Sequence, residues 1–418
     1  MQLIIHGSKH NRYSINALLG ALESRGMLPS LPVVLTDTAP GLKKEVAQLA
    51  AQAVIAFSFF STQLPETVRL LGELRALCKQ RPILIAGGAH ATGATVETVA
   101  LGFDYVVRGE GEATFPDLIA AILNQEDVNS VAGLYYRAPD GAVRHTGRRA
   151  SINLDKYLPF APAVRRFGPI EITRGCPFAC HFCQAAQLAG AGIRHRSIEA
   201  VAKLVTLLHR RKLDDIRVIT PNVFSYGSED GKKVNIEALA GLFETVRRII
   251  GSRGHFFAGS FPSEVRPEHV SDTTMRLLRE FADNDNLVIG AQSGSQRMLD
   301  LCHRCHTVDD VVHAVELAVR YGYKPYVDFI FGLPGENGED MAESLALMRQ
   351  LIDMGARVHG HTFMPLPGTV FAVKPPGSLP PRLRKIINAL TATGKAFGNW
   401  QHQEKQARAL LALRQERL

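Results

Sequence analysis

The stretch CPFACHFC at residues 176–183 brings three cysteines, Cys176, Cys180 and Cys183, into one short loop. Three thiolates at this spacing can hold three irons of a four-iron four-sulfur cluster, which leaves the fourth iron open to another ligand. A structural zinc ion takes four ligands, usually from two separated pairs, so the loop favours a cluster over zinc or over core cysteines. The apolar run 169–173 before the loop predicts a strand, which places the thiolates at the carboxyl edge of a sheet.

The composition is that of a globular protein. The 418 residues are enough for two or three domains, and 46% hydrophobic against 21% charged residues predicts large buried cores. The longest apolar stretches fall well short of the roughly 20 residues that cross a bilayer, and the first residues lack the features of a secretory signal. The sequence therefore predicts a soluble, cytoplasmic protein with no membrane segment.

The cysteine usage and the charge narrow the chemistry. Six cysteines, three of them in one loop, favour metal binding over a disulfide framework. An open cluster would react with oxygen, so an anaerobic or reducing setting is expected. The net charge of +8 is a weak sign of a nucleic-acid partner, because no interleaving of aromatic and basic residues accompanies it. Nucleic acid is therefore not the predicted partner.

Residues 1–125 alternate short apolar runs with amphipathic stretches. The runs lie at residues 3–5, 33–35, 54–60, 83–86 and 105–107. Strand-sized runs separated by helical patterns predict an α/β fold with a doubly wound parallel sheet, whose sites form at the carboxyl ends of the strands. The turns at those ends contain His10, Asn11, Ser58, Phe59, Ser61, Thr62, Gly87, Gly88, His90, Ala91, Gly109, Glu110 and Gly111.

The rest of the chain divides into three further parts. Residues 126–165 are a polar, turn-rich connector with a predicted hairpin, and residues 371–418 are a helical extension after a proline-rich bend. Between them, residues 166–370 resume the alternation of strands and helices. The predicted strands lie at 170–173, 216–220, 255–260, 287–291, 326–331 and 358–363. Such a set is too small for a closed eight-stranded barrel.

The cysteine loop, with its strand and glycine turn, resembles the cluster loop of the radical S-adenosylmethionine (SAM) superfamily. The loops of residues 1–125 resemble the cobalamin-binding domain that precedes many of these enzymes, above all Gly-Gly-x-His-x-Thr at 87–92 and Arg-Gly-Glu-Gly-Glu at 108–112. The resemblance implies a Rossmann-like cobalamin-binding domain, then a partial (β/α)6 radical SAM barrel and a helical C-terminal tail. It also implies three cofactors: a [4Fe-4S] cluster on the three cysteines, SAM, and cobalamin bound by the turn residues named above.

One departure from the cobalamin domains concerns the cobalt. Classical members carry Asp-x-His-x-x-Gly after the first strand, and its histidine ligates cobalt from below. This chain has Ser-Lys-His-Asn-Arg-Tyr at 8–13, which keeps only His10. Because relatives among radical SAM enzymes usually bind cobalamin without that ligand, two readings of His10 stay open, a lower cobalt ligand and a plain surface histidine.

The resemblance also implies SAM contacts at the ends of the barrel strands. The residues concerned are Phe182, Asn222, Ser260, Gln292, Ser293, Ile330 and Leu333. The family's Gly-Gly-Glu after the second strand is absent, and Thr-Pro-Asn-Val-Phe at 220–224 stands there, so Asn222 is the expected substitute.

For two further groups of residues, the sequence does not settle the role. It does not single out a catalytic residue, but Tyr226, Tyr323 and Asp328 are candidates to face the substrate. The segment Cys-His-Arg-Cys-His at 302–306 fits either a second metal site or a structural loop. The loop is favoured, because relatives carry a Met-x-Arg-x-His-Thr-like turn there.

The function implied by the resemblance is a cobalamin-dependent radical SAM methyltransferase that adds a methyl group to an unactivated carbon. The compact layout resembles methanogen-type members, some of which modify methyl-coenzyme M reductase, so a peptide or protein substrate is expected. An electron donor such as ferredoxin or flavodoxin is the expected partner.

The alternatives are a cobalamin-dependent cyclase or oxidase acting on a small molecule, and a non-catalytic sensor of the cluster or of cobalamin. A tRNA methylthiotransferase is disfavoured, because that family carries three further cysteines in its N-terminal domain and this one has only Cys78.

Overall fold

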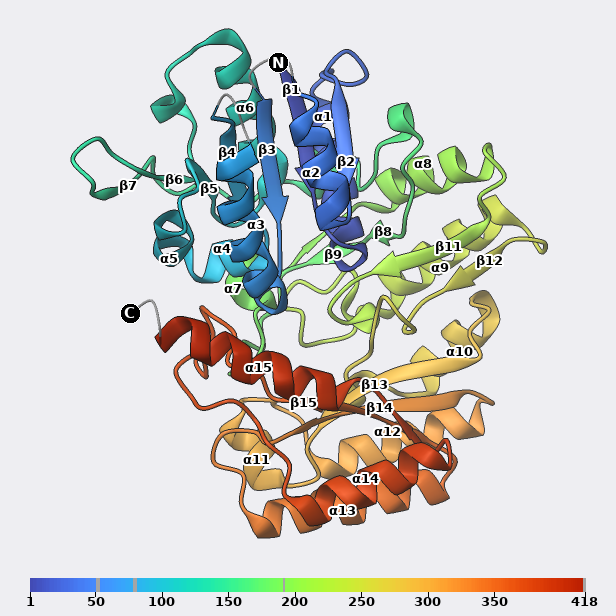
Figure 1. Ribbon diagram of the computed structural model, residues 1–418. Coiled ribbons are helices and arrows are strands. Elements are labelled where there is room, and N and C mark those ends of the chain that lie inside the picture. Colours follow the sequence, from blue (N-terminus) through green and yellow to red (C-terminus); the bar gives the residue numbers. More distant parts are fainter. Residues whose placement is uncertain (50–52, 78–80, 191, 416–418) are drawn as a thin grey trace.

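The computed structural model describes residues 1–49, 53–77, 81–190 and 192–415. An N-terminal α/β domain lies above a second domain of strands and helices, and the last helix returns to the N-terminal domain (Figure 1).

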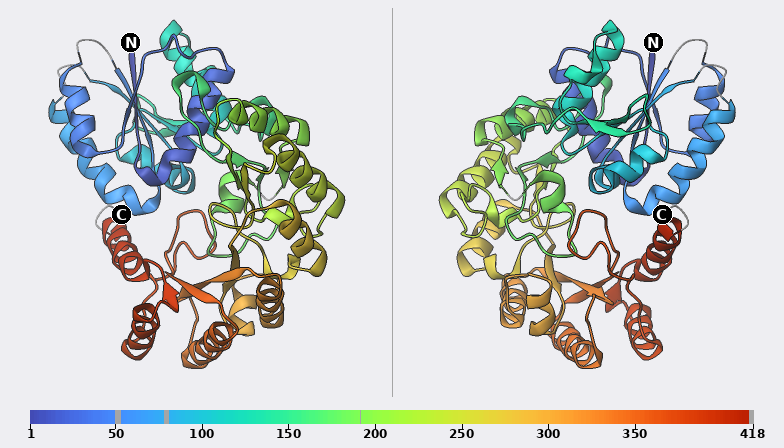
Figure 2. Two further views of the ribbon diagram at one scale, coloured as in Figure 1. Left: turned by 90° about the vertical axis from the view of Figure 1, so that its right-hand side faces the viewer. Right: turned by 90° about the vertical axis from the view of Figure 1, so that its left-hand side faces the viewer.

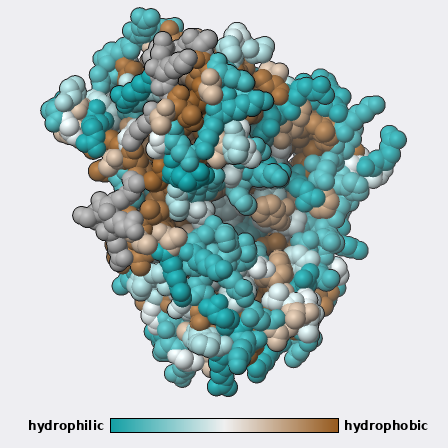
Figure 3. Space-filling model, in the orientation of Figure 1, coloured by the Kyte–Doolittle hydropathy of each residue, from teal (hydrophilic) through white to brown (hydrophobic). Residues whose placement is uncertain are grey.

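Hydrophilic side chains cover most of the face in Figure 3, and hydrophobic ones gather mainly in its upper half. Within the described ranges, no helix has both the length and the apolar character needed to cross a membrane.

The N-terminal domain is built on one sheet with the strand order β2-β1-β3-β4-β5-β6-β7. Strands β1 to β5 run parallel, so the five predicted runs form the parallel part of the sheet. The hairpin β6–β7, from the predicted connector, extends the same sheet antiparallel. The strands are β1 (Gln2–His6), β2 (Val33–Thr36), β3 (Ala53–Ser58), β4 (Ile83–Gly87), β5 (Tyr105–Val107), β6 (Leu134–Arg137) and β7 (Val143–His145).

Helices cover both faces of this sheet (Figure 2). One core cluster joins the sheet to α1 and α6, and a second joins its other face to α2 and α3. Every residue of the central strand β3 is buried, as expected for a strand covered on both faces. The predicted doubly wound fold is therefore confirmed. The helices are α1 (Arg12–Ser24), α2 (Ala39–Ala47), α3 (Leu64–Leu77), α4 (Ala89–Gly93), α5 (Thr95–Ala100) and α6 (Gly111–Asn124).

The second domain is a partial barrel of parallel strands. Two sheets, ordered β12-β11-β8 and β13-β14-β15-β16, are linked through the bridges Thr220–Ser263 and Val265–Ile289. The predicted strands are all present, and β16 adds a short edge. The strands are β8 (Ile170–Glu171), β11 (Asp215–Ile219), β12 (His255–Phe257), β13 (Asn286–Gln292), β14 (Lys324–Phe331), β15 (Arg357–Thr362) and β16 (Ala396–Phe397).

The barrel helices pack their apolar faces on these strands and form the largest core of the chain. Five of them begin at a residue whose side chain accepts a hydrogen bond from the first helical turn, which satisfies an otherwise unpaired backbone amide. These caps are Ser197, Asn235, Ser271, Thr307 and Asn337. The helices they begin are α8 (Ile198–His209), α9 (Ile236–Ile250), α10 (Asp272–Phe281), α12 (Val308–Arg320) and α13 (Gly338–Asp353).

The cysteine loop is an excursion closed at its base by a short antiparallel pair, β9 (Thr173–Arg174) and β10 (Arg194–His195). Gly175 begins the excursion with a φ of 92°, and a Cβ there would lie 2.2 Å from the carbonyl oxygen of Gly192. Only glycine fits this turn. Helix α7 (Ala185–Ala189) follows the last cysteine, and α11 (Gln296–Leu301) lies after β13.

The C-terminal extension is helical, as predicted. Helix α14 (Pro381–Ala392) packs on β16, and α15 (Trp400–Gln415) contacts both β15 and α3. Leu410 of α15 belongs to the core cluster of the N-terminal domain. The tail therefore ties the barrel to the first domain.

Candidate active site

A cavity of about 530 Å³ lies between the loops at the carboxyl edges of the two domains. It continues between the N-terminal sheet and helices α1 and α6, where Ile5, Leu18 and Phe115 line it. Loops predicted to bind two different cofactors line this one space. The predicted site residues on its wall are Ser58, Gly87, Gly88, Gly109, Glu110, Gly111, Cys176, Cys180, Cys183 and Asn222.

The three thiols of the loop are shielded from solvent. Cys180 is buried, while Cys176 and Cys183 are partly buried. Burial raises the pKa of Cys176 and raises that of Cys183 to about 11. Iron binding therefore has to displace protons from these thiols, and the affinity for metal will rise with pH.

The arrangement of the thiols fits a cluster better than a single ion. Three sulfurs around one zinc ion at 2.3 Å would lie about 3.8 Å apart. Within the described residues, the one group whose ligand atoms gather within 4.8 Å for a single ion is Asp328, His359 and His361, not the cysteines. The wider spacing of the sulfurs suits a larger inorganic core.

Two buried arginines that the sequence did not single out lie at the cysteine loop. Nη1 of Arg304 is 3.5 Å from Sγ of Cys180, and the guanidinium of Arg266 stacks 3.4 Å from the ring centre of Phe178. Both arginines line the cavity. Positive charge beside a thiolate favours its formation and its binding to metal. Arg304 stands inside the segment 302–306, and this position was the one feature of the sequence that could have pointed to it.

The segment 302–306 supports the loop rather than offering a second metal site. Cys302 is buried in a small apolar core, whereas Cys305 is exposed. Nδ1 of His303 is 2.7 Å from the carbonyl oxygen of Phe178, and the amide of His181 donates to the carbonyl of Cys302 at 3.0 Å. These contacts hold the cysteine loop in place, in line with the structural reading of the segment.

Glycines shape the wall of the cavity that the N-terminal domain provides. Gly88 has a φ of 91°, and a Cβ there would lie 2.9 Å from the amide nitrogen of Phe59. The ring of Phe59 stacks on His90 behind this wall at 5.3 Å, and Ser61 Oγ lies 3.0 Å from His90 Nδ1. Among the predicted cobalamin contacts, Phe59, Ser61, His90 and Ala91 are thus buried supports. Thr62 is also outside the residues that line the cavity.

Gly88→Ala should strongly weaken cobalamin binding. Its conformation is one that only glycine adopts without strain, so the backbone costs roughly 1–3 kcal/mol and the contact with Phe59 adds to this. Gly141, in the β6–β7 hairpin with a φ of 84° and no atom within 4 Å of an added Cβ, is the matched control for the backbone cost alone. Absorbance titration with cobalamin should show a defect for the Gly88 variant only, and equal affinities would contradict the assignment.

The first loop of the N-terminal domain lies apart from the cavity. His10 is exposed in a short 3-10 helix and does not line the cavity. Asn11 is buried, and its Oδ1 accepts hydrogen bonds from Ser8 Oγ at 2.8 Å and Gln63 Nε2 at 2.7 Å. This placement favours the reading of His10 as a surface histidine.

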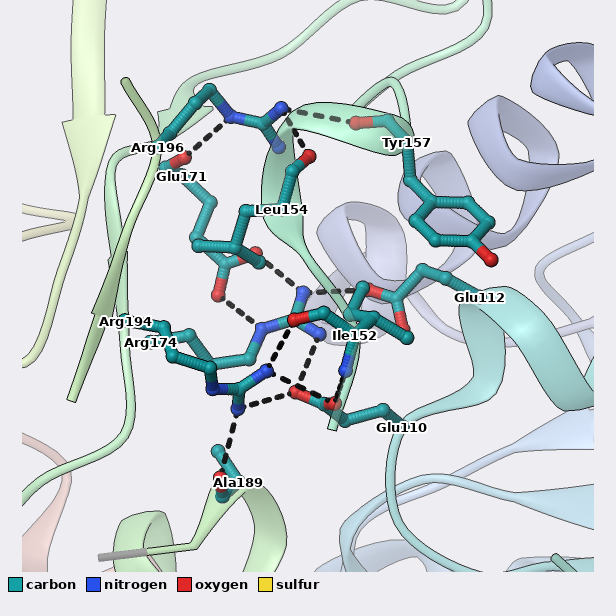
Figure 4. Close-up of polar contacts among 10 residues, drawn as sticks. All are labelled: Glu110, Glu112, Ile152, Leu154, Tyr157, Glu171, Arg174, Ala189, Arg194 and Arg196. Atoms are coloured by element: carbon teal, nitrogen blue, oxygen red, sulfur yellow. Dashed lines mark hydrogen bonds and ion pairs between the residues drawn. The ribbon is translucent and has the colours of Figure 1, made fainter. Parts of the chain in front are cut away.

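The two carboxylates of Arg-Gly-Glu-Gly-Glu bind arginines of the second domain (Figure 4). Glu110 Oε1 lies 3.1 Å from Nη1 of Arg174 and 2.7 Å from Nη2 of Arg194, and Glu112 Oε1 lies 2.5 Å from Nη2 of Arg174. Burial alone would raise the pKa of Glu110, but hydrogen bonds from Arg194 and from the amide of Ile152 lower it. Because Arg174 precedes Cys176 by two residues, this network fixes the cysteine loop against the cobalamin-type loop.

The residues expected to contact SAM fall into two groups. Phe182, Ile330 and Leu333 come together in one small apolar cluster beside the cysteine loop. Asn222 lines the cavity, with Oδ1 accepting from the amide of Arg266 at 3.2 Å. Ser260 is buried, and its Oγ has no hydrogen-bond partner in the described ranges.

The turn at the end of β13 is buried. Gln292 has a φ of 77°, a conformation uncommon outside glycine. Ser293 Oγ lies 3.3 Å from Ser344 Oγ, so α13 supports the turn.

The three catalytic candidates are in different places. Tyr226 lies in the barrel core, where its hydroxyl donates to the carbonyl of Arg196 at 2.7 Å. Tyr323 stands at the amino end of β14, the edge opposite to the cysteine loop. Asp328 lies on β14, whose neighbours Val327 and Phe329 face the outer core, so its side chain faces the barrel interior.

Asp328 forms a polar cluster with two histidines of β15. Its Oδ1 is 2.8 Å from Nδ1 of His359 and 3.9 Å from Nε2 of His361. Gln403 Oε1 accepts from the amide of Thr362, so its NH2 group faces Nδ1 of His361 at 3.2 Å. His361 therefore turns an N–H toward Asp328 at an ion-pair distance, while His359 makes the hydrogen bond to that carboxylate.

Glu264 is a cavity residue that the sequence did not reveal. It lies between β12 and β13 and lines the cavity. Burial, and then the charge of Asp328, raise the pKa of Glu264 to about 7. A carboxyl group that titrates near neutrality in a cavity is suited to exchanging a proton with a bound molecule.

Glu264→Gln should change how stability depends on pH. The folded glutamate ionises near pH 7 and the unfolded one near 4.5, so the wild type loses stability as the pH rises between these values. In protein without cofactors, the difference in melting temperature, variant minus wild type, should be larger at pH 8 than at pH 5. The exposed Glu244→Gln is the control, and a difference equal at both pH values would contradict the assignment.

Family models divide the chain in the same way as the structure. A model described as the radical SAM superfamily matches residues 170–348, and one described as a B12 binding domain matches residues 6–119. The two domains imply a [4Fe-4S] cluster, SAM and cobalamin. The donor set of three spaced thiols and the glycine wall of one shared cavity fit these groups.

Three curated relatives of this chain are 23–31% identical to it. The chain is 24% identical over 284 residues to an uncharacterized methyltransferase, PH0819, of Pyrococcus horikoshii, which covers 64% of this chain and 58% of that one. The chain spans 47–62% of the length of three such curated relatives.

Two solved structures share the fold. The radical SAM methyltransferase TsrM from Kitasatospora setae, solved with cobalamin and a [4Fe-4S] cluster, matches with a TM-score of 0.68 at 17% identity and covers 90% of this chain and 78% of that one. The cobalamin-dependent radical enzyme OxsB matches with a TM-score of 0.66 at 17% identity, covering 83% and 51%. With both domains matched in order, the chain belongs to the radical SAM superfamily, in the group that carries a B12-binding domain before the radical SAM domain.

Proposed function

We propose that this protein is a cobalamin-dependent radical SAM methyltransferase that adds a methyl group to an unactivated carbon. The observation that carries the proposal is the single cavity whose wall includes both the three cysteines and the glycine turns of the B12-binding domain. Methylation of a substrate carbon in this way requires SAM and cobalamin to reach the same substrate. A shared cavity meets this requirement. The relative PH0819, described as an uncharacterized methyltransferase, supports the same reaction class.

In this proposal, Cys176, Cys180 and Cys183 hold the cluster, while Ser58 and Gly88 belong to the surface that holds cobalamin. When bound, the cluster supplies the electron for reductive cleavage of SAM, and cobalamin carries the methyl group. The chain's own residues position these groups and shield them from water.

Individual side chains contribute distinct effects. Arg304 places positive charge beside the sulfur of Cys180. The apolar cluster of Phe182, Ile330 and Leu333 excludes water next to the loop. Asn222 lines the cavity and offers a polar group to SAM, whereas Ser260, Gln292 and Ser293 are buried outside the residues that line it.

The substrate belongs to the proposal as well. From the resemblance to methanogen-type members, we infer a carbon in a peptide or protein, as in methyl-coenzyme M reductase. The carboxyl of Glu264 lines the cavity where a substrate would lie, and the charge of Asp328 on β14 acts on it. These groups suit a polar substrate portion that donates hydrogen bonds.

A cobalamin-dependent cyclase or oxidase is the second candidate, and Glu264 favours it, because such reactions remove protons as well as hydrogen atoms. One measurement separates the two. Protein reconstituted anaerobically with iron, sulfide and cobalamin is given SAM and a strong reductant, and the SAM products are quantified.

Methyl transfer predicts both deoxyadenosine and S-adenosylhomocysteine, each dependent on cobalamin. Deoxyadenosine alone would support the cyclase or oxidase. If neither product forms in protein shown to hold both cofactors, the protein does not cleave SAM in the absence of its substrate.

A further inference from the structure

A second recess, of about 480 Å³, lies between helix α1 of the N-terminal domain and the start of β11 in the barrel. Four arginines line it: Arg12, Arg165, Arg166 and Arg217. The one acidic residue among those that line it is Asp215. The recess therefore carries a strong positive charge at the junction of the two domains.

Most of this charge is not balanced by the protein. Nε of Arg217 is 3.0 Å from Oδ1 of Asp215, which neutralises one arginine. Arg166 donates from Nε to the neutral amide oxygen of Asn16 at 3.2 Å, and the polar contact of Arg12 is with the ring and hydroxyl of Tyr13. Across the described residues, no carboxylate lies within 4.0 Å of the guanidinium groups of Arg12, Arg165 or Arg166.

Like charges around one recess repel one another, and an oxyanion relieves this repulsion. The planar guanidinium fork matches the oxygens of a phosphate or carboxylate and binds them through two parallel hydrogen bonds. An isolated surface arginine needs no such partner, but several arginines that surround a recess with a single acidic neighbour favour one.

The recess adjoins the cofactor cavity. Tyr13, Asn16, Gly168 and Pro169 line both spaces. Asn16 is buried and joins the domains, since its Nδ2 donates to the carbonyl of Phe167 at 3.0 Å while its Oδ1 accepts from Arg166. An anion in the recess would thus lie next to whatever fills the cavity.

We propose that this arginine-lined recess is a binding site for a phosphate-type oxyanion. Two sources share this chemistry: the phosphodiester in the nucleotide tail of cobalamin, and a phosphate group on a separate molecule. The first source rests on the proposed cobalamin function, and the second does not.

The test compares wild type with the double variant Arg165→Gln/Arg166→Gln. Each is titrated with cobalamin and with cobinamide, which has the same corrin ring but lacks the nucleotide tail, and each is heated with and without inorganic phosphate. Arg382→Gln, on the exposed face of α14, is the control for the loss of one positive charge away from the recess. Circular dichroism checks that all variants fold.

If the tail phosphate occupies the recess, the double variant binds cobalamin roughly tenfold or more weakly, the loss expected for one charge-assisted hydrogen bond, and binds cobinamide as wild type does. If the anion comes from another molecule, both corrinoids bind unchanged, and phosphate raises the melting temperature of wild type and the Arg382 variant but not of the double variant.

The proposal is overturned if the double variant matches wild type for both corrinoids and for phosphate. Cobinamide binding by wild type tests the cobalamin site by itself. If wild type binds neither corrinoid, the tail is excluded as the source and the phosphate measurement decides.

Discussion

Cys180→Ser should reduce reductive cleavage of SAM to background. Cys180 is the most buried cysteine of its loop, and a serine oxygen is a poor ligand for iron in a site built for thiolates. The cluster should be lost or unstable, so both deoxyadenosine formation and the iron content of the reconstituted protein should fall. Anaerobic product analysis and iron determination measure these two effects.

Cys302→Ser is the matched control for this experiment. Cys302 is also buried, and burial followed by the nearby Cys180 raises its pKa to about 12, so it stays a protonated thiol. Its replacement should leave iron content and SAM cleavage close to wild type. Equal losses in both variants would mean that the cluster does not depend on the 176–183 loop alone.

Arg174→Met should strongly destabilise the protein. Arg174 is bound to Glu110, Glu112 and Glu171, and the side chain of Glu112 is only 8% exposed. Removing one partner of a buried ion pair leaves a charge without compensation, which costs about 3–5 kcal/mol. The apparent melting temperature should fall sharply.

Two variants separate this effect from a general loss of charge. Arg81 pairs with Asp104 at a site where the arginine is 78% exposed, so Arg81→Met should cost only about 0–1 kcal/mol. Adding Glu112→Gln to Arg174→Met should restore part of the stability, because the unpaired carboxylate is removed. Similar melting temperatures for the Arg174 and Arg81 variants would contradict the network.

Local patterns in the sequence were sufficient to predict most of the fold. The buried strand β3 is a continuous apolar run, and the caps Ser197 and Thr307 stand directly before amphipathic stretches. The cysteine loop was evident because its ligands are adjacent in the chain. Signals of this kind depend on neighbours a few residues apart, which a sequence displays directly.

Features that depend on distant partners were not visible. Glu110 was predicted as a cobalamin contact from its glycine-rich turn, but its carboxylate binds Arg174 and Arg194, more than sixty residues away. The titration of Glu264 depends on burial and on Asp328, which lies on another strand. Such effects arise from the packing of strands and domains, which the local pattern does not encode.

The central claim is that one cavity brings the iron–sulfur cluster and cobalamin together. Electron paramagnetic resonance of the doubly loaded protein, with the cluster reduced and cobalamin in its cob(II)alamin form, tests it directly. The account predicts a magnetic interaction between the two spins, visible as splitting or fast relaxation that disappears when either cofactor is left out. Two independent, unperturbed signals from protein that holds both cofactors would contradict it.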